Sequence, residues 1–194
     1  MESFQNLQKI IQQRRSIKPA QMNGRKIQDS EIEELLFLAD LAPTHGHTEP
    51  WRFIIYADQA LKDFCTAFSS LYQKYQSPEK FNEEKFIKMQ NWHQHVSHLL
   101  VTYMHKGTNP KIPEQEEYAA VSAAIEHILL AATAKGMASF WSTSFPIYHD
   151  SLKQYLQLTE NDILMGFISL GYSDWPWQPT KRMIPLNEKF SWRK

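Results

Sequence analysis

The 194-residue sequence is short of cysteine, of net charge and of long apolar runs, and each shortage excludes a class of protein. Its one cysteine, Cys65, cannot form an intrachain disulfide, which is typical of a reducing compartment. The 21 basic and 21 acidic side chains cancel, so no overall field attracts nucleic acid or an anionic membrane. No apolar run reaches the roughly 18 residues that a spanning helix needs, and residues 1–5 contain no apolar signal core. We therefore expect a soluble, cytoplasmic protein without nucleic-acid or membrane partners.

The single thiol is a weak candidate for catalysis. Cys65 lies among Leu61, Phe64 and Phe68, which form an apolar stripe at helical spacing. We interpret Cys65 as a core residue rather than as a nucleophile.

The composition allows one well-formed core. With 42% hydrophobic residues over this length, residues 1–194 are predicted to form a single domain. Aromatic residues reach 13%, which suits a large core, a subunit interface or a platform for planar ligands. Composition alone does not choose among these three.

The hydrophobic periodicity predicts a mixture of helices and strands. Apolar residues at helical spacing indicate helices over 4–13, 30–42, 59–73, 114–135 and 150–157, and short apolar runs indicate strands over 53–56, 99–105, 137–143 and 163–170. Residues 74–98 are polar and predict a helical excursion over the core. Ser30 and Glu33 form a possible capping box, and Gly136 is a natural helix C-cap. Because strands and helices mix without strict βαβ alternation, we expect an α+β fold.

The stretch from Ala42 to Phe53 is the most informative part of the sequence. Pro43 ends a helix, a polar turn that contains Gly46 follows, and Pro50-Trp51 opens an apolar strand. Polar groups displayed between a helix and a buried strand are a common location for a binding site.

Two basic segments could bind phosphate. Arg14-Arg15-Ser16 follows a short amphipathic helix, and Lys181-Arg182 lies near the C-terminus. Arginine binds phosphate in bidentate fashion, but either segment alone is weak evidence, because a solvated helix end or surface charge explains it better.

Taken in order, these features resemble the nitroreductase family over essentially the whole chain. The order is Arg-Arg-Ser near the start, an Ala-Pro…Pro-Trp turn some 30 residues later, Gly171-Tyr172 after the last strand, and then Lys181-Arg182. The resemblance implies an α+β sandwich with a central, mainly antiparallel sheet flanked by helices. It also implies an interlocked homodimer that holds FMN at each subunit interface.

The resemblance also implies roles for individual residues. Arg14, Arg15 and Ser16 would bind the FMN phosphate or ribityl chain, and Lys181 and Arg182 would close over the phosphate.

A second group would lie along the flavin ring. Thr44, His45 and His47 would come from the partner subunit, and Trp141-Ser142-Thr143 would bring backbone N–H groups to the reactive edge of the flavin.

The sequence departs from the family pattern at several of these positions. His47 replaces a usual Asn, Glu49 replaces a usual Gln, and Ser142 stands where shorter relatives often carry Arg. His47 can still donate a hydrogen bond, whereas a carboxylate beside the ring would lower the flavin potential, so we expect Glu49 to face a subunit partner. Lys85 or Lys88 could supply the positive charge that stabilises the reduced flavin anion.

The chemistry implied is that of the cofactor. NAD(P)H would reduce FMN, and the flavin would then reduce a nitro, quinone or similar electron-poor acceptor, with no catalytic side chain required. Two alternatives remain: a different flavin reaction on the same scaffold (enone reduction, dehalogenation or flavin destruction), or flavin binding without turnover.

Two other patterns have competing explanations. His93, His95 and His98 suggest a metal site, but no Asp, Glu or Cys completes a recognised spacing, and we expect no bound metal. The Trp-Pro-Trp-Gln-Pro segment at 175–179 suggests a partner motif or a stacking platform. We interpret it as part of an arm that packs on a second subunit.

Overall fold

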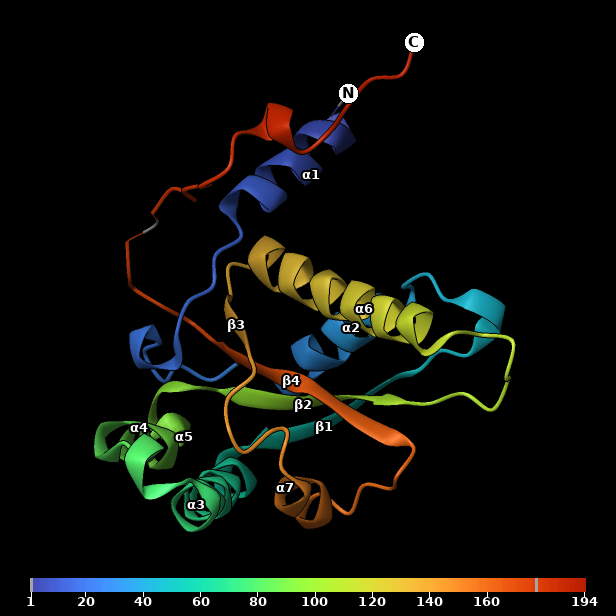
Figure 1. Ribbon diagram of the computed structural model, residues 1–194. Helices are drawn as coiled ribbons and strands as arrows, with labels where there is room; N and C mark the ends of the chain where they lie inside the picture. The colour runs from blue at the N-terminus through green and yellow to red at the C-terminus, as the bar shows by residue number, and fades with distance from the viewer. Residues whose placement is uncertain (1, 177) are drawn as a thin grey trace.

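The computed structural model describes residues 2–176 and 178–194, and within them the chain folds around a four-stranded sheet (Figure 1). The strand order is β1-β2-β4-β3. The strands are β1 (Trp51–Ala57), β2 (His98–His105), β3 (Ala138–Ser142) and β4 (Asp162–Gly171). Neighbouring strands pair antiparallel throughout, so the predicted α+β class with its mainly antiparallel sheet is confirmed.

The two central strands are covered on both faces. Leu100 of β2 and Ile168 of β4 belong to one buried cluster, whereas Val101 and Phe167 belong to the other. This division follows from the two-residue period of a strand, which sends successive side chains to opposite faces.

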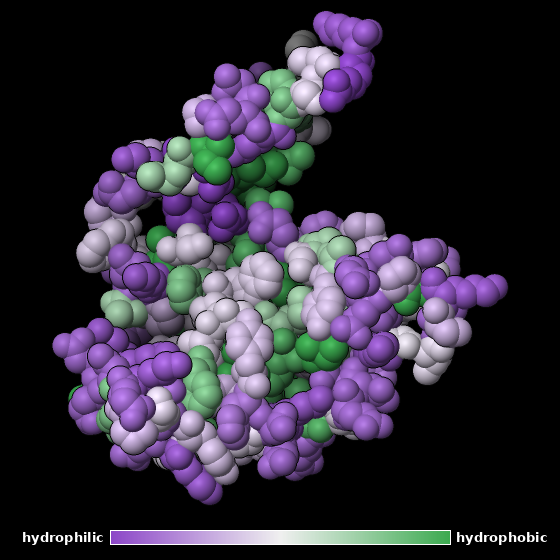
Figure 2. Space-filling model, viewed as in Figure 1, coloured by the Kyte–Doolittle hydropathy of each residue, from purple (hydrophilic) through white to green (hydrophobic). Residues whose placement is uncertain are grey.

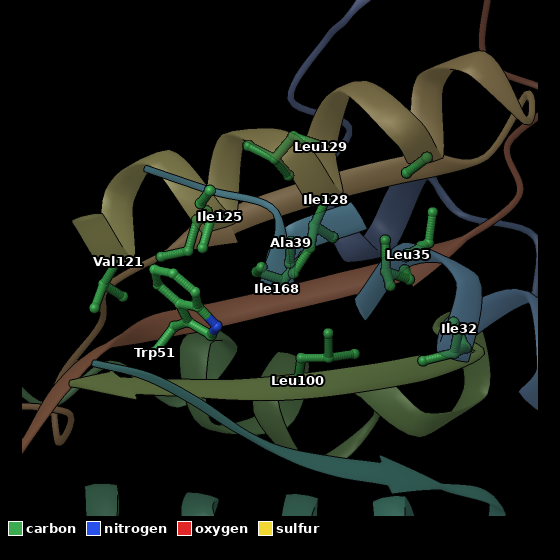
Figure 3. Close-up of a cluster of buried hydrophobic side chains, with 14 of the residues drawn as sticks. Ile32, Leu35, Ala39, Trp51, Leu100, Val121, Ile125, Ile128, Leu129 and Ile168 are labelled. Carbon is green, nitrogen blue, oxygen red and sulfur yellow. The ribbon is translucent and has the colours of Figure 1, made fainter. Parts of the chain in front are cut away.

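Helices form a layer on each face of the sheet. On one face lie α2 (Asp29–Asp40) and the long α6 (Glu114–Ala134), whose side chains meet the sheet around Trp51 and Ile168 (Figure 3). The other face is covered by α3 (Asp58–Tyr75), α4 (Glu83–Gln90), α5 (Trp92–His95) and α7 (Asp150–Tyr155). Short 3₁₀ turns are η1 (Pro19–Gln21), η2 (His45–His47), η3 (Pro78–Lys80) and η4 (Leu186–Glu188).

Helix α1 (Glu2–Gln13) and the C-terminal arm (described over residues 174–176 and 178–194) lie beside each other and project from the body (Figures 1 and 2). Both segments leave large apolar side chains in solvent. On α1 these are Phe4, Leu7 and Ile11, and on the arm they are Met183, Ile184, Leu186, Phe190 and Trp192. Trp177, part of the predicted arm motif, lies outside the described residues.

The predicted elements are present with small shifts at their ends, and two local predictions were wrong. Helix α2 begins at Asp29, and the Gln28 N–H donates to the Glu31 carboxylate at 3.4 Å, so Ser30 and Glu33 do not cap it. His98 opens β2 and is buried instead of belonging to the polar excursion. Gly136 does end α6 with a φ of +72°, as expected.

The sheet also contains an irregularity next to β3. Between Thr102 and Tyr103 the register of β2 against β4 shifts by one residue, opposite Gly166. The Thr102 hydroxyl donates to the Gly166 carbonyl at 2.9 Å, which fixes the bulge.

Asp162 ties the start of β4 to its surroundings. Its Oδ2 accepts hydrogen bonds from the Thr159 N–H and hydroxyl, both at 2.7 Å, and its Oδ1 lies 2.7 Å from His105 Nδ1. Burial alone would raise the pKa of Asp162, but the hydrogen bonds from His105 and Thr159 outweigh it, and the net pKa is below the ordinary value.

We predict that Asp162→Asn lowers the free energy of unfolding at pH 7 by about 1–3 kcal/mol, because it removes a buried, multiply bonded carboxylate. A depressed carboxyl pKa contributes stability above the unfolded pKa of about 3.9, and that contribution is lost as pH falls through the folded value. The free energy of unfolding, measured with urea between pH 7 and pH 2, should therefore fall less steeply with decreasing pH in the variant. Glu160→Gln, a substitution of an exposed neighbour, serves as the control. The same dependence of the unfolding free energy on pH in both variants would contradict the assignment.

Candidate functional site

A cavity of about 650 Å³ opens where β3 ends, and its lining combines cations with apolar and aromatic side chains. We call it the lysine cavity. Three segments that are far apart in the sequence meet there: Lys18, Pro19 and Ala20; Lys85, Ile87, Lys88, Met89, Asn91, Trp92 and His95; and Phe140, Ser142, Thr143 and Ser144. None of these described lining residues is a carboxylate, so the cavity favours an occupant that is planar, partly apolar and negatively charged.

The position of Lys85 follows from the local structure of α4. Asn82 caps the helix by accepting the Lys85 backbone N–H at 2.8 Å, and the Asn82 N–H donates to the Tyr72 hydroxyl at 2.8 Å. The Lys85 ammonium lies 5.0 Å from the centre of the Tyr72 ring. Partial burial lowers the pKa of Lys85, so an anion in the cavity would stabilise its charged form.

Lys18 reaches the cavity because the segment before it runs along the edge of the sheet. Ser16 forms a parallel bridge with Ser139, and the Ile17 N–H donates to the Ser139 carbonyl at 2.9 Å. This contact brings a segment from the N-terminal part of the chain to β3, the strand that carries Ser142.

The end of β3 is held by its neighbour β4. Trp141 Nε1 donates to the Met165 carbonyl at 3.1 Å, and Trp141 remains partly exposed. A Cβ on Gly166 would approach Trp141 Nε1 to 2.5 Å and the Ser142 carbonyl to 2.9 Å. The absence of a side chain at Gly166 therefore allows the segment leading into the cavity wall to pack closely on the sheet.

The two adjacent arginines point to different partners. Arg14 pairs with Glu126 of α6, with 3.4 Å between Nε and Oε1. Arg15 lines a second cavity of about 660 Å³, between α1 and the arm, which we call the arm cavity. Its lining residues are Lys9, Ile11, Gln12, Gln13, Arg15, Pro179, Thr180 and Arg182. The structure thus brings Arg15 and Arg182 into one cavity, whereas Lys181 is exposed outside it.

The polar turn lies on the other face of the sheet. Thr44, His45 and His47 belong to or adjoin η2, and His45 pairs with Glu116 near the start of α6. The lysine cavity is bounded instead by α4 and α5 on the opposite face. Within one chain the sheet therefore separates Thr44, His45 and His47 from the residues that line the lysine cavity.

The turn itself is locally constrained. Gly46, His47 and Glu49 have φ values of +59°, +56° and +43°, and the Thr44 hydroxyl accepts the Glu49 N–H at 3.2 Å. Left-handed conformations at His47 and Glu49 cost roughly 1–2 kcal/mol each, which is typical of a segment shaped for contact.

The structure therefore brings together only part of the site expected from the sequence. Ser142 and Thr143 share the lysine cavity with Lys85 and Lys88, while Trp141 flanks it. Lys18 joins the cavity although no motif in the sequence marks it; its one signal is that it continues Arg14-Arg15-Ser16 along an extended segment. The different partners of Arg14 and Arg15 likewise have no signal in the sequence.

The three histidines considered for metal binding face different partners. His93 Nδ1 lies 2.9 Å from the Gln90 carbonyl, His95 lines the lysine cavity, and buried His98 bonds to Asp29 and Ser97. Among the described residues there is no cluster of three or more His, Cys, Asp or Glu side chains that could hold a metal ion.

Cys65 lies in the core, and burial raises the pKa of its thiol to about 11. At neutral pH it is protonated and inaccessible, in agreement with its interpretation as a structural residue. In the part of the chain that is described, no helix combines the length and apolar character needed to cross a bilayer.

Comparison with known proteins identifies relatives over most of the chain. The model of the nitroreductase family matches residues 11–172. A Bacillus subtilis protein with the provisional name NAD(P)H nitroreductase YfhC is 28% identical over 185 residues, covering 95% of this chain and 93% of the relative. An Archaeoglobus fulgidus protein, provisionally named NADH dehydrogenase/NAD(P)H nitroreductase, is 32% identical over 170 residues and covers 84% and 83%.

Solved structures share the fold. A nitroreductase-like family protein from Bacillus cereus has a TM-score of 0.80 at 24% identity, over 97% of this chain and 96% of that one. NfnB from Mycobacterium smegmatis, an FMN-dependent nitroreductase solved with NADPH, gives 0.77 at 16% identity over 98% and 99%. A Desulfovibrio desulfuricans protein provisionally named as a nitroreductase and solved with FMN gives a TM-score of 0.74 at 18% identity over 97% and 96%.

We predict that Gly166→Ala displaces Trp141 and Ser142 and lowers the free energy of unfolding by about 2–4 kcal/mol, because the new methyl group adds a clash to a strained φ of +139°. The matched control is Gly136→Ala, which has a φ of +72° but no atom within 4 Å of the new Cβ. That control should lose only about 1–2 kcal/mol. Chemical denaturation with Trp fluorescence measures both effects, and equal losses would show that contact with β3 is unimportant.

Proposed function

The chain belongs to the nitroreductase family, and on that premise we propose that it is an FMN-dependent oxidoreductase. It takes hydride from NAD(P)H and passes hydride or electrons, through bound flavin, to a nitro, quinone or similar small electron-poor acceptor. The observation that carries this proposal is the lysine cavity, in which three distant segments bring cations and aromatic walls together beside β3. The relatives' names and the FMN-bound and NADPH-bound neighbours support it.

The residues present fit a flavin. A volume of about 650 Å³ is within the usual range for a cofactor pocket, and Trp92, Met89 and Phe140 offer apolar surface to a planar ring. Lys18 and Lys85 offer positive charge without a carboxylate in the lining. The donor set therefore suits a molecule with both a phosphate and a ring that becomes anionic on reduction.

In this mechanism the protein's own side chains bind the flavin and orient it. Bound FMN supplies the hydride and electron transfer chemistry. Lys18, Ser142 and Thr143 hold the cofactor's polar groups, and Lys85 or Lys88 stabilises negative charge in the cavity. Arg14, Ser16, Lys181 and Arg182 lie outside the lining of the lysine cavity, and in this proposal they would bind the phosphate where it extends beyond that lining, with Arg14 exchanging Glu126 for the anion.

A second copy of the chain completes the site in this proposal. Thr44, His45 and His47 lie across the sheet from the lysine cavity, so one chain cannot bring them to its own cavity. Exposed apolar side chains of α1, of the arm and of α2 with its C-cap, where Phe37 is 66% and the capping Leu41 63% exposed, provide surface for such a dimer. We place the dimer in the cytoplasm, where a single reduced thiol is usual.

The acceptor distinguishes this function from other flavin reactions on the same scaffold. Enone reduction, dehalogenation and flavin destruction use the same cofactor, and turnover of such substrates without turnover of nitroaromatics or quinones would favour them. A yellow protein that does not oxidise NAD(P)H with any acceptor would instead be a flavin carrier.

We predict that the purified protein shows flavin absorption at about one FMN per chain, and that Arg14→Ala binds FMN roughly 10- to 100-fold more weakly. The loss corresponds to one charge-assisted bond of about 1.5–3 kcal/mol. Fluorescence titration of apoprotein with FMN measures the affinity. Glu126→Gln is the matched control, because it removes the partner of Arg14 but keeps the guanidinium, and it should bind at least as tightly as the parent. An Arg14→Ala protein as yellow as the parent would overturn the phosphate assignment.

We also predict that deletion of residues 175–194 gives monomeric or poorly soluble protein, because the arm can then no longer pack on the second subunit and the apolar side chains of α1 stay in solvent. Size-exclusion chromatography with light scattering reports the mass, and deletion of residues 193–194 alone serves as the control. A dimer that remains intact and loaded with flavin after the longer deletion would contradict the role of the arm.

A further inference from the structure

The side chain of Arg15 is engaged by backbone carbonyls of two segments. Its NH1 donates to the Gln12 and Arg14 carbonyls, both at 2.6 Å, and its Nε donates to the Gln178 carbonyl. Gln12 lies in the last turn of α1, where carbonyls lack a partner within the helix. One planar guanidinium thus caps α1 and holds the arm at the same time.

Among the described residues, hydrogen bonds attach the arm to the body at its root and again at Gln178. At its root, the Ser173 hydroxyl donates to the Gln21 carbonyl at 2.6 Å, and Asn23 Nδ2 donates to Asp174 at 2.9 Å. The second attachment is Arg15 to Gln178, and Lys181 and Arg182 follow three and four residues later. Over so few residues an extended chain spans at most about 10–14 Å, so the Arg15 contact limits where these two cations can lie.

The side chain of Arg15 points away from the lysine cavity, which Lys18 lines. Arg15 and Ile17 line a common recess with Thr133, Gly136 and Ser173, whereas Lys18 lines the lysine cavity. Successive side chains point to opposite sides along the extended segment around Ser16, so Arg15 lies on the side that faces the arm.

We propose that Arg15 is a positioning residue that fixes the C-terminal arm, and that it thereby sets the placement of Lys181 and Arg182 over the anionic end of the cofactor. This inference rests on the proposed function, since it takes those two cations as phosphate contacts. It replaces a direct contact between Arg15 and the cofactor by an indirect effect through the arm.

The first test is independent of the cofactor. Trypsin cleavage after Lys181 and Arg182, followed by mass spectrometry in the absence of FMN, should be roughly tenfold faster in Arg15→Ala, because the arm is released from α1. Arg15→Lys should also be cleaved faster, since an ammonium lacks the planar fork that spans carbonyls of both segments. Lys9→Ala removes a cation from the same cavity and should leave the rate unchanged.

The second test is a double-mutant cycle on FMN affinity with Arg15→Ala and Arg182→Ala. Each single variant should bind FMN roughly tenfold more weakly or worse, and the double variant should be little weaker than Arg182→Ala alone. Circular dichroism of each variant verifies folding, and Arg15→Lys provides a second substitution should Arg15→Ala fail to fold.

The outcomes separate the two proposals. Unchanged proteolysis in Arg15→Ala, or additive losses of affinity with rescue by Arg15→Lys, would overturn the positioning role in favour of direct charge on the phosphate. A parent protein that takes up no FMN would overturn the proposed function, while the proteolysis rates would still report whether Arg15 holds the arm.

Discussion

The antiparallel pairing of β2 with β4 is the constraint on which the rest of this structure depends. Both strands are buried on both faces, so each needs a hydrophobic layer on either side, and the helices supply those layers. The pairing also fixes the position of β3, which bonds to β4 from Ala138 opposite Gly171 to Ser142 opposite Phe167. The pairing of β3 with β4 ends at Ser142, and the chain beyond it, Thr143 and Ser144, forms part of the wall of the lysine cavity.

Gly166 connects this pairing to the site. It lies at the bulge in β4 and leaves room for Trp141 and the Ser142 carbonyl, both of which a side chain would displace. The bulge at Gly166 therefore allows Trp141 and Ser142, which lead into the cavity wall, to pack closely on β4. Gly166 contacts the strand that leads into the cavity wall, so we expect a substitution there to change both the stability of the sheet and the shape of the cavity.

The electrostatics of the site arise from contacts between segments rather than from overall charge. The chain as a whole is neutral, yet Lys18, Lys85 and Lys88 gather in one cavity, and Arg15 and Arg182 gather in another. Locally concentrated positive charge in a partly desolvated cavity acts on an anion more strongly than the same charges spread over a surface. The arm contributes to this concentration because its position depends on α1.

The sequence by itself determined the class of fold, most helices and strands, and the family, because apolar periodicity and the order of short motifs are local properties of the chain. It also predicted Ser142 and Thr143 as site residues, and both line the lysine cavity, and it predicted Cys65 as a core residue, which is buried. Only the tertiary structure decided that Lys18 joins Lys85, that Arg14 faces Glu126 while Arg15 faces the arm, and that His98 is buried beside Asp29. These outcomes depend on which segments meet across the sheet and along α1, and contacts between residues distant in sequence leave no periodic signal in the sequence itself.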